Sequence, residues 1–394
     1  MVVQPKVKGF MCTTAHPEGC KESVRRQIEY VKSQPKAEGP KKVLVLGASM
    51  GYGLASRIAL TYACGADSIG VIFDKPGKEK RTASAGWYNT AAFEQFAQND
   101  GHYAKSINGD AYSQEIKEET IALIKKDFGQ VDMVIYSLAA PRRKAPDGVT
   151  YRSVLKTVDK EFTNQSIDLL TNELTTVTIP PATEEEINDT IKVMGGWMLW
   201  MEALQEADVL ADGAKTVAYS YIGPELTYPI YYDGSIGQAK QDLYRTADKI
   251  NEHIQGTEAY VAVNKAVVTQ SSSAIPIVPL YISILFKVMK ELNLHEGCIE
   301  QMYRLVHDRL CVEGGVPTDE NHLIRMDDYE MKPEVQEEVK KIWEKISPEN
   351  LSELTDIDGY WQEFYEIFGF RIEGVDYDAD VNIQTSIPSI ISAE

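Results

Sequence analysis

The 394-residue sequence predicts an α/β fold, a doubly wound parallel sheet with helices on both faces. Two observations support this prediction. Between residues 42 and 268, short apolar runs of strand length alternate with longer segments in which apolar residues recur every three or four positions. A glycine-rich turn, GASMGYG at 47–53, lies directly between the first apolar run and the first helical segment. Together they are typical of a Rossmann-type fold.

The first half of the chain contains four of the expected strands. They are the apolar runs at 42–47, 68–73, 103–108 and 131–137, which suit strands that are buried on both faces. Helices are expected between them, at 51–64, 91–99 and 114–128. Gly65 ends the first helix and Asp74 closes the second strand.

After Pro141 the alternation stops. Residues 142–185 are polar and turn-rich, with short alternating pieces such as ELTTVTI, and predict a small hairpin insertion. A helix at 184–207, strands at 214–223 and 259–268, and a long helix from Gly237 follow; residues 282–345 are mostly helical. We therefore expect one elaborated Rossmann-type domain over 1–394, with a core at about 40–280, the insertion at about 142–185 and a helical C-terminal elaboration at about 282–394.

The composition excludes several classes of partner. A formal net charge of −19 argues against binding to nucleic acid or to an anionic membrane surface, because phosphates would be repelled at long range. The most apolar stretch, Ala274–Met289, is shorter than the roughly 20 residues of a membrane span and contains two prolines. We therefore expect no membrane span.

The cysteines and the N-terminal segment indicate a reducing compartment. Five scattered cysteines do not form a disulfide framework, and MVVQPKVKGF lacks the apolar segment of a secretory signal peptide. We expect a cytoplasmic protein. Cys12, His16 and Cys20 are close in sequence but lack the tighter pairs of a zinc site, so no metal is predicted.

The glycine-rich turn predicts a phosphate-binding site. Gly47, Gly51 and Gly53 follow a strand and open a helix, so the backbone can approach a pyrophosphate whose charge meets the N–H groups of the helix N-terminus. The spacing GxxxGxG matches that of short-chain dehydrogenases. The alternative is a tight turn that binds no ligand, but the strand before the turn and the acid after the second strand favour a dinucleotide.

The ends of the next three strands supply the other expected contacts. The carboxylate of Asp74 can accept hydrogen bonds from the adenosine ribose and would repel a 2′-phosphate, which favours NADH over NADPH. The basic residues that follow it could soften this discrimination, and a solvated turn is the alternative role for Asp74. Asp110 and Ala111 would face the adenine, and Leu138 and Ala139 would lie beside the nicotinamide ribose.

Tyr231 and Lys240 are the candidate catalytic pair. Tyr231 follows the fifth strand, and GSIGQAK then enters a helix that can carry Lys240 back toward the cofactor. A nearby cation stabilises phenolate character in a group with an ordinary pKa of about 10. The YxxxK spacing of short-chain dehydrogenases is absent here, and the alternative for Tyr231 is an aromatic half-buried beside Tyr228 and Tyr232.

Longer motifs carry a resemblance that runs essentially from end to end. The chain resembles the FabV-type enoyl-acyl-carrier-protein reductases and the related trans-2-enoyl-CoA reductases. The motifs are GFMCTTAHPEGC at 9–20, GASMGYGLASR at 47–57, AGWYN at 85–89, GDAYS at 109–113, YSLAAPRRK at 136–144, KVMGG at 192–196, AYSYIGPE at 218–225, IYYDGSIGQAK at 230–240, KAVVTQSSSAIP at 265–276, LFKVMKE at 285–291, HEGCIEQ at 295–301 and GVDYDADVN at 374–382.

The resemblance implies a set of site residues. The family's active-site tyrosine and lysine fall on Tyr231 and Lys240, and its second substrate-contacting tyrosine falls on Tyr221. Besides Lys240, its cofactor contacts fall on Gly47, Ala48, Ser49, Met50, Gly51, Tyr52, Phe73, Asp74, Asp110, Ala111, Leu138, Ala139, Val267, Val268 and Thr269. One departure is that Gly196 joins Trp197 directly, where the family has an acidic pair.

The activity implied is reduction of the 2,3 double bond of a trans-2-enoyl thioester by NADH, the final reductive step of fatty-acid elongation on acyl carrier protein. A reductase acting on free CoA thioesters is the alternative, and a non-catalytic nucleotide-binding scaffold is the alternative from another class. We expect a monomer. Arg142, Arg143 and Lys144 could form a cationic patch for an acidic carrier or for CoA phosphates, with a solvated loop as the third option.

Overall fold

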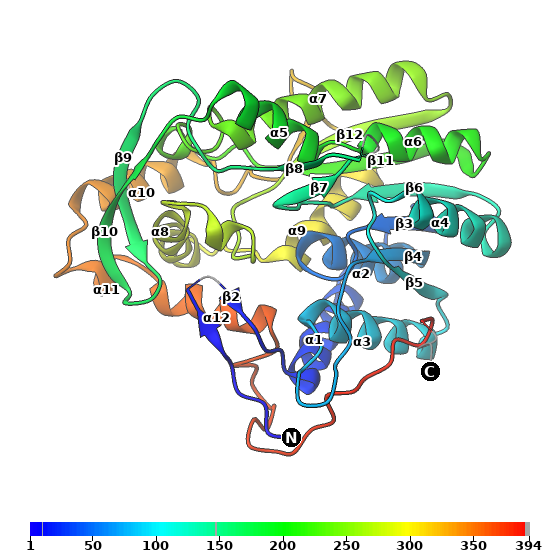
Figure 1. Cartoon of the computed structure of the whole chain (residues 1–394), viewed down its shortest axis with the longest axis horizontal. Helices are drawn as coiled ribbons and strands as arrows, with labels where there is room; N and C mark the ends of the chain where they lie inside the picture. The colour runs from blue at the N-terminus through cyan, green and yellow to red at the C-terminus, as the bar shows by residue number, and fades with distance from the viewer. Residues whose placement is uncertain (10, 146–147, 391–394) are drawn as a thin grey trace.

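A seven-stranded parallel sheet forms the centre of the computed structural model, which describes residues 1–9, 11–145 and 148–390 (Figure 1). The spatial order is β13-β12-β11-β6-β3-β4-β5, and every neighbouring pair is parallel. This is the strand order of the doubly wound dinucleotide-binding folds with one strand added. The predicted fold class is confirmed. The strands are β3 (Lys42–Leu46), β4 (Asp67–Ile72), β5 (Ala104–Asn108), β6 (Val131–Tyr136), β11 (Leu210–Ser220), β12 (Thr257–Val263) and β13 (Leu323–Arg325).

Both faces of the sheet are buried, as the continuous apolar runs predict. Val43 and Val45 of β3 belong to one core, whereas Leu44 and Leu46 belong to the other, because successive side chains of a strand point to opposite faces. The first core is covered by α1 (Pro17–Ser33), α2 (Gly51–Cys64), α3 (Ala85–Asn99), α8 (Val278–Glu291), α9 (Cys298–Leu305), α10 (Pro333–Lys345) and α12 (Ile357–Ile367). The second is covered by α4 (Gln114–Asp127), α6 (Trp197–Glu206) and α7 (Ser235–His253) (Figure 1).

The strand order reverses between β3 and β6, and this is where such folds bind ligands. Leu46 pairs with Tyr136, so Gly47 and Ser137 leave the sheet side by side at its carboxyl edge. A Cβ atom on Gly47 would lie 2.2 Å from the Ser137 carbonyl oxygen. A larger residue would clash here, so glycine is required where the two segments leave the sheet.

Several element boundaries differ from the expected ones. The predicted helix at 184–207 is two helices, α5 (Glu184–Met194) and α6, because the chain turns at Gly196 with a φ of +115°. The insertion contains two hairpins, β7 (Arg142–Lys144) with β8 (Thr150–Arg152) and β9 (Phe162–Asp168) with β10 (Glu173–Ile179); residues 146 and 147 lie outside the described part. β13 lies within residues 282–345, which were expected to be mostly helical, and no strand was predicted there. A short N-terminal hairpin, β1 (Val7–Lys8) with β2 (Met11–Cys12), and α11 (Leu351–Leu354) complete the elements.

The C-terminal tail packs on the body of the protein although it lacks apolar periodicity. The Tyr88 hydroxyl donates to the Ile383 carbonyl at 2.7 Å, and Trp87 Nε1 donates to the Thr385 carbonyl at 2.7 Å. Figure 1 shows the tail running past α1 and α3 toward the C-terminus. None of the described helices is long and apolar enough to span a bilayer.

Candidate active site at the carboxyl edge of the sheet

The glycine-rich turn has the shape of an anion cradle. A Cβ atom on Gly53 would lie 1.9 Å from the Gly47 carbonyl oxygen, so this glycine lets α2 pack against the end of β3. Gly51, with a φ of +53°, would meet no atom within 4 Å. α2 begins at Gly51, and the N–H groups of a helix's first turn are the ones that can bind a phosphate. Gly47 and Gly53 are thus required for packing, whereas a side chain on Gly51 would meet no neighbouring atom.

The remaining residues of the turn are held from outside it. The Ser49 carbonyl oxygen accepts a hydrogen bond from Asn89 Nδ2 at 3.2 Å. The Tyr52 hydroxyl donates to the Lys265 carbonyl oxygen at 2.6 Å and so ties the start of α2 to the segment after β12. Ala48 is buried, and Met50 packs against the first core. These contacts anchor the turn to α3 and to the segment after β12.

Asp74 has one carboxylate oxygen to spare. Its Oδ1 accepts a hydrogen bond from the Ser84 hydroxyl at 2.8 Å, whereas the buried Oδ2 has no partner of ordinary hydrogen-bond geometry among the described residues. Burial raises the pKa of the Asp74 carboxyl, and the hydroxyls of Ser49 and Ser84 partly oppose this. A buried acceptor without a donor is costly, and the hydroxyl of a ribose would supply one. The preceding Phe73 is 78% exposed.

The predicted adenine and nicotinamide-ribose residues lie at the ends of β5 and β6. Asp110 Oδ1 accepts the backbone N–H of Tyr112 at 2.9 Å, and the carbonyl of buried Ala111 accepts Trp200 Nε1 at 2.9 Å. Leu138 is half-buried beside the glycine-rich turn, since its Cδ2 would lie 3.2 Å from a Cβ on Gly47. Ala139 is exposed. The structure therefore brings these residues to the same edge as Gly47 and Asp74.

Tyr221 and Tyr231 meet at the end of β11. Their ring centroids are 4.8 Å apart and the rings are nearly perpendicular, at 88°. Tyr231 is only 8% exposed, yet no described residue forms a hydrogen bond with its hydroxyl. Burial raises the pKa of the Tyr231 phenol, with a smaller contribution from Tyr244. The phenol is thus a protonated donor that no described residue engages.

Lys240 reaches the same region from α7. Its Nζ donates to the Tyr219 carbonyl oxygen at 2.8 Å, two residues before Tyr221. Burial lowers the pKa of the Lys240 ammonium to about 8. The ammonium is thus held by a backbone carbonyl, and its effect on the Tyr231 phenol, one of its two expected roles, stays a prediction.

Gly237 explains how this segment folds. A Cβ atom there would lie 1.9 Å from the Tyr232 carbonyl oxygen and 2.4 Å from that of Tyr231. The glycine lets the first turn of α7 pack directly against the tyrosine turn, three residues before Lys240. The spacing GSIGQAK contains this information, although sequence reasoning did not assign Gly237 a role.

The segment after β12 closes the site. Val267 and Val268 are buried, and Thr269 is fixed by reciprocal bonds with Ser272, from its own N–H to Ser272 Oγ at 2.9 Å and from the Ser272 N–H to Thr269 Oγ1 at 3.0 Å. The Ala266 N–H donates to the buried carboxylate of Glu330 at 2.7 Å. Glu330 lies in the acidic stretch DDYEMK, where no sequence pattern distinguishes it from its solvated neighbours.

The expected cationic patch is only partly a surface. Arg142 and Lys144 are exposed, but Arg143 is 6% exposed, stacks over the Tyr112 ring at 4.6 Å and donates to the Lys192 carbonyl at 3.1 Å. Alternation along β7 turns Arg143 inward. The interpretation of Arg143 as a docking residue is therefore wrong.

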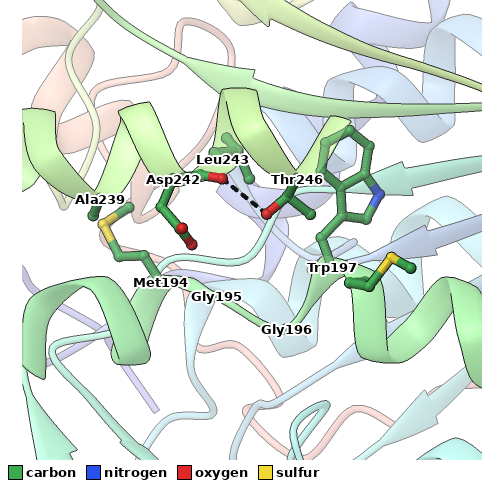
Figure 2. Close-up of a pocket in the computed structure, with 9 residues that line it drawn as sticks. Met194, Gly195, Gly196, Trp197, Ala239, Asp242, Leu243 and Thr246 are labelled. Carbon is green, nitrogen blue, oxygen red and sulfur yellow. Dashed lines mark hydrogen bonds between the residues drawn. The ribbon is translucent and has the colours of Figure 1, made fainter. Parts of the chain in front are cut away.

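A separate cavity of about 170 Å³ lies between the α5–α6 junction and α7 (Figure 2). Met194, Gly196 and Trp197 line one side, and Ala239, Asp242 and Thr246 line the other. The Thr246 hydroxyl is bound to the Asp242 carbonyl oxygen at 2.8 Å. The cavity contains none of the predicted catalytic or cofactor residues and is small for a ligand pocket, which usually exceeds roughly 300 Å³.

Comparison with known proteins identifies the family. Residues 2–79 match the NAD(P)H binding domain of trans-2-enoyl-CoA reductase, residues 81–311 match the trans-2-enoyl-CoA reductase catalytic region, and residues 318–381 match the enoyl reductase FAD binding domain. The trans-2-enoyl-CoA reductase [NADH] of Ruminiclostridium cellulolyticum is 56% identical over 99% of this chain and 100% of its own length. The enoyl-[acyl-carrier-protein] reductase [NADH] of Coxiella burnetii is 54% identical over 99% of this chain and 98% of its own length.

Solved structures agree with this assignment. The trans-2-enoyl-CoA reductase of Clostridium acetobutulicum in complex with NADH superimposes with a TM-score of 0.95, at 43% identity over 98% of this chain and 100% of that one. The trans-2-enoyl-CoA reductase of Treponema denticola in complex with NAD gives a TM-score of 0.93, at 46% identity over 97% and 98%. Motifs, fold and site geometry agree with these matches: the chain belongs to the family of trans-2-enoyl-CoA reductases and FabV-type enoyl-acyl-carrier-protein reductases.

Proposed function

We propose that the protein uses NADH to reduce the 2,3 double bond of trans-2-enoyl thioesters, the final reductive step of fatty-acid elongation. The observation that carries the proposal is the unengaged phenol of Tyr231. It is buried beside Tyr221, at the same sheet edge as the glycine-rich turn and Asp74. A donor that none of the described residues engages, at the same sheet edge as a dinucleotide cradle, suits a substrate oxygen that gains charge during hydride transfer.

The chain has groups that fit each part of the cofactor. NADH, when bound, supplies a hydride to the β-carbon of the enoyl thioester. The N–H groups around Gly51 would hold its pyrophosphate, and the spare Asp74 Oδ2 would accept a ribose hydroxyl. A 2′-phosphate would meet a buried carboxylate, which favours NADH over NADPH. Phe73, Asp110, Ala111, Leu138, Ala139 and the 267–269 segment would complete the cofactor site.

Tyr231 would stabilise the transition state. Negative charge grows on the thioester oxygen as the enolate forms, and a hydrogen bond from the phenol strengthens as that charge grows. Its raised pKa keeps the phenol protonated at neutral pH, as a hydrogen-bond donor must be. Lys240, held by the Tyr219 carbonyl, would orient the cofactor, and Tyr221 would support the thioester.

The acyl carrier is the second question. Relatives that share more than half of their residues with this chain have names of both kinds, one for CoA thioesters and one for acyl-carrier-protein thioesters. We take the carrier protein as the physiological substrate and free CoA thioesters as the alternative. We further propose a cytoplasmic monomer; all five cysteines are free thiols, as in a reducing compartment.

Steady-state kinetics test the function directly. Crotonyl-CoA and a matched crotonyl-carrier protein are compared, each with NADH and NADPH in parallel, by the loss of absorbance of the reduced cofactor. We expect turnover with both acyl substrates, a lower KM for the carrier-linked one and a preference for NADH. No cofactor oxidation with either substrate would refute the proposed function.

A further inference from the structure

Glu330 is a fully buried carboxylate whose partners all lie at or beside the candidate active site. It is 0% exposed and accepts three hydrogen bonds: from the Tyr221 hydroxyl at 2.9 Å, from the Tyr281 hydroxyl at 2.6 Å and from the Ala266 N–H at 2.7 Å. Its position is fixed by the segment after β13, where the N–H groups of Met326 and Asp327 both donate to the Val263 carbonyl, at 2.8 and 3.0 Å.

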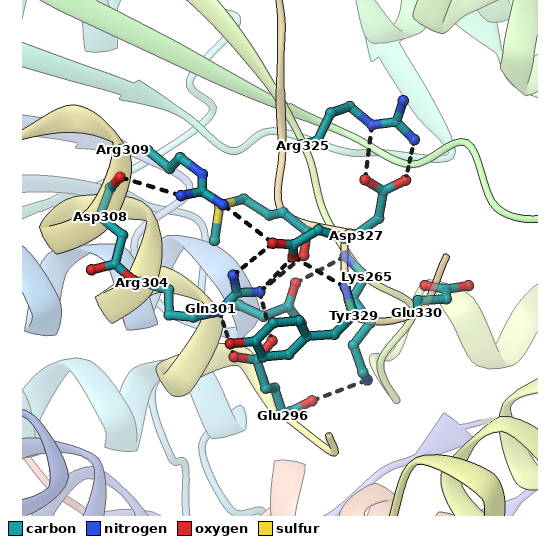
Figure 3. Close-up of polar contacts among 12 residues, drawn as sticks. Lys265, Glu296, Gln301, Arg304, Asp308, Arg309, Arg325, Asp327, Tyr329 and Glu330 are labelled. Atoms are coloured by element: carbon teal, nitrogen blue, oxygen red, sulfur yellow. Dashed lines mark hydrogen bonds and ion pairs between the residues drawn. The ribbon is translucent and has the colours of Figure 1, made fainter. Parts of the chain in front are cut away.

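The charged side chains described around Glu330 form their ion pairs with one another and not with Glu330. Figure 3 shows Arg325 bound to Asp327 and Arg304 bound to Glu296, and these ion pairs have distances of 2.7 and 2.6 Å. Lys265 donates its ammonium protons to the carbonyls of Ala266 and Glu296, at 2.8 and 3.1 Å. In the described part of the chain no cation lies within ion-pair distance of Glu330. Burial raises the pKa of its carboxyl, and the hydrogen bonds from Tyr281, Ala266 and Tyr221, together with the charge of nearby Lys265, oppose this and favour the carboxylate.

The direction of these bonds determines what each tyrosine can do. An ionised carboxylate only accepts, so the Tyr221 proton is bound to Glu330 and is not available to another acceptor. The Tyr231 hydroxyl, by contrast, has no partner among the described residues. The edge-to-face contact with Tyr221, at 4.8 Å and 88°, fixes the Tyr231 ring. Glu330 thus determines both the orientation of Tyr221 and the surface on which Tyr231 packs.

We propose that Glu330 is a positioning residue of the reaction: it holds the proton and ring of Tyr221, so that Tyr231 is the one phenol of the pair that donates to the thioester oxygen. The inference rests on the proposed enoyl reduction. Through Ala266 the same carboxylate also holds the 266–269 segment, the expected cofactor wall, in register with the tyrosines.

Glu330→Gln separates these two tasks. The Ala266 N–H can only donate, so the amide oxygen of the glutamine would turn toward it and the segment would stay in place. The amide NH₂ group would then face the two phenols as a donor and would reverse the hydrogen bond to Tyr221. We expect kcat to fall about tenfold or more, the effect of losing one hydrogen bond to a charged group, with little change in the KM for NADH.

Asp327→Asn is the matched control. Asp327 is also 0% exposed, lies three residues earlier in the same segment and undergoes the same carboxylate-to-amide change, but its side chain binds Arg325 rather than a site residue. Its kcat should stay within about twofold of wild type while its melting temperature falls, because a buried carboxylate loses its ion pair with the partly exposed Arg325. If Glu330→Gln does not fold, Glu330→Asp takes its place.

A double-mutant cycle with Tyr221→Phe decides the proposal. If Glu330 acts through Tyr221, Glu330→Gln will change kcat by less than about twofold in the Tyr221→Phe background, and the pattern will not follow the melting temperatures. The proposal would be overturned if the effects of Glu330→Gln and Tyr221→Phe on kcat multiply in the double mutant. An unchanged kcat in Glu330→Gln alone, or an equal loss of kcat in Asp327→Asn, would also overturn it. A wild-type protein that does not oxidise NADH with enoyl thioesters would instead refute the proposed function, and the positioning role with it.

Discussion

Gly86 lies directly against the carboxylate of Asp74. A Cβ atom on Gly86 would be 2.5 Å from each of the two carboxylate oxygens. Gly86 belongs to the first turn of α3, and Ser84, the residue that caps this helix, donates to Asp74 Oδ1 at 2.8 Å. The start of α3 therefore shapes the pocket around the carboxylate, and a single methyl group would fill the space that it occupies.

Gly86→Ala should displace the Asp74 carboxylate and raise the KM for NADH, with little change in kcat at saturating cofactor. The expected rise is at least about tenfold, since a hydrogen bond to a charged group is lost or distorted. Steady-state kinetics in varied NADH measure it. In an Asp74→Ala background the added methyl group has room, so Gly86→Ala should then have almost no further effect. Equal effects in both backgrounds would mean that the glycine serves helix packing instead.

Asp74→Ala should raise the KM for NADH and narrow the difference from NADPH. The carboxylate is the group expected to bind the ribose diol and to repel a 2′-phosphate, so removing it weakens one cofactor and relieves the other. The ratio of kcat/KM for the two cofactors is the readout. Ser84→Ala, which removes one donor but keeps the charge, should leave that ratio close to wild type. An unchanged ratio in Asp74→Ala would show that the adenosine pocket was assigned wrongly.

Local patterns predicted the sheet because each strand is buried on both faces. Runs such as VLVL in β3 are continuously apolar, and the glycine-rich turn marks where the first strand ends. β13 could not be found in this way. It has three residues, lies at the edge of the sheet and pairs with β12 from more than 50 positions away along the chain. Its position depends on tertiary pairing, for which LIR alone gives no signal.

The site residues that were predicted differ from those that were missed in the same way, by whether their role depends on local sequence or on distant contacts. The predicted residues at the ends of β3 to β6 meet at one edge because parallel strands place their carboxyl ends together. Gly86 and Glu330 were missed because their roles depend on which distant side chain they contact. A glycine in AGWYN and a glutamate in DDYEMK have ordinary helix-start and surface roles until the fold brings them to Asp74 and Tyr221.

Tyr231→Phe should lower kcat by at least ~100-fold, the lower end of a general-acid contribution, and leave NADH binding nearly unchanged. The hydroxyl has no partner among the described residues, so its removal should cost little stability. Tyr228→Phe is the matched control: its ring packs on Tyr232 at 4.9 Å, outside the Tyr221–Tyr231 pair. Near-normal turnover in folded Tyr231→Phe would move the donor role to another residue.

Lys240 should cause an alkaline loss of activity. Burial lowers the pKa of its ammonium from 10.5 to about 8, so kcat/KM for NADH should fall as the pH rises through about 8.

The contribution of Lys240 to stability should change in the opposite direction. Between pH 8 and 10.5 the unfolded chain binds the proton that the folded chain has released, so this group's contribution to the free energy of unfolding increases with pH. In Lys240→Arg the side chain stays charged, so the loss of kcat/KM should occur at a higher pH. If the pH of this loss does not change, another group causes it.

The exposed face of the β7–β8 hairpin should bind the acyl carrier. Arg142 pairs in register with Arg152, so two cations face each other on the side opposite buried Arg143. Like charges across a strand pair are unfavourable unless an anion lies over them, and an acidic enzyme needs such a patch to meet an acidic carrier.

The double variant Arg142→Glu with Arg152→Glu should raise the KM for crotonyl-carrier protein more than the KM for a short crotonyl thioester without phosphate. The difference between wild type and variant in the KM for the carrier should shrink at high salt. Lys340→Glu with Lys345→Glu, exposed on α10, makes the same charge change and should leave both values alone. A loss confined to crotonyl-CoA would favour CoA as the carrier, whereas unmoved KM values for every substrate would exclude the hairpin as the docking surface.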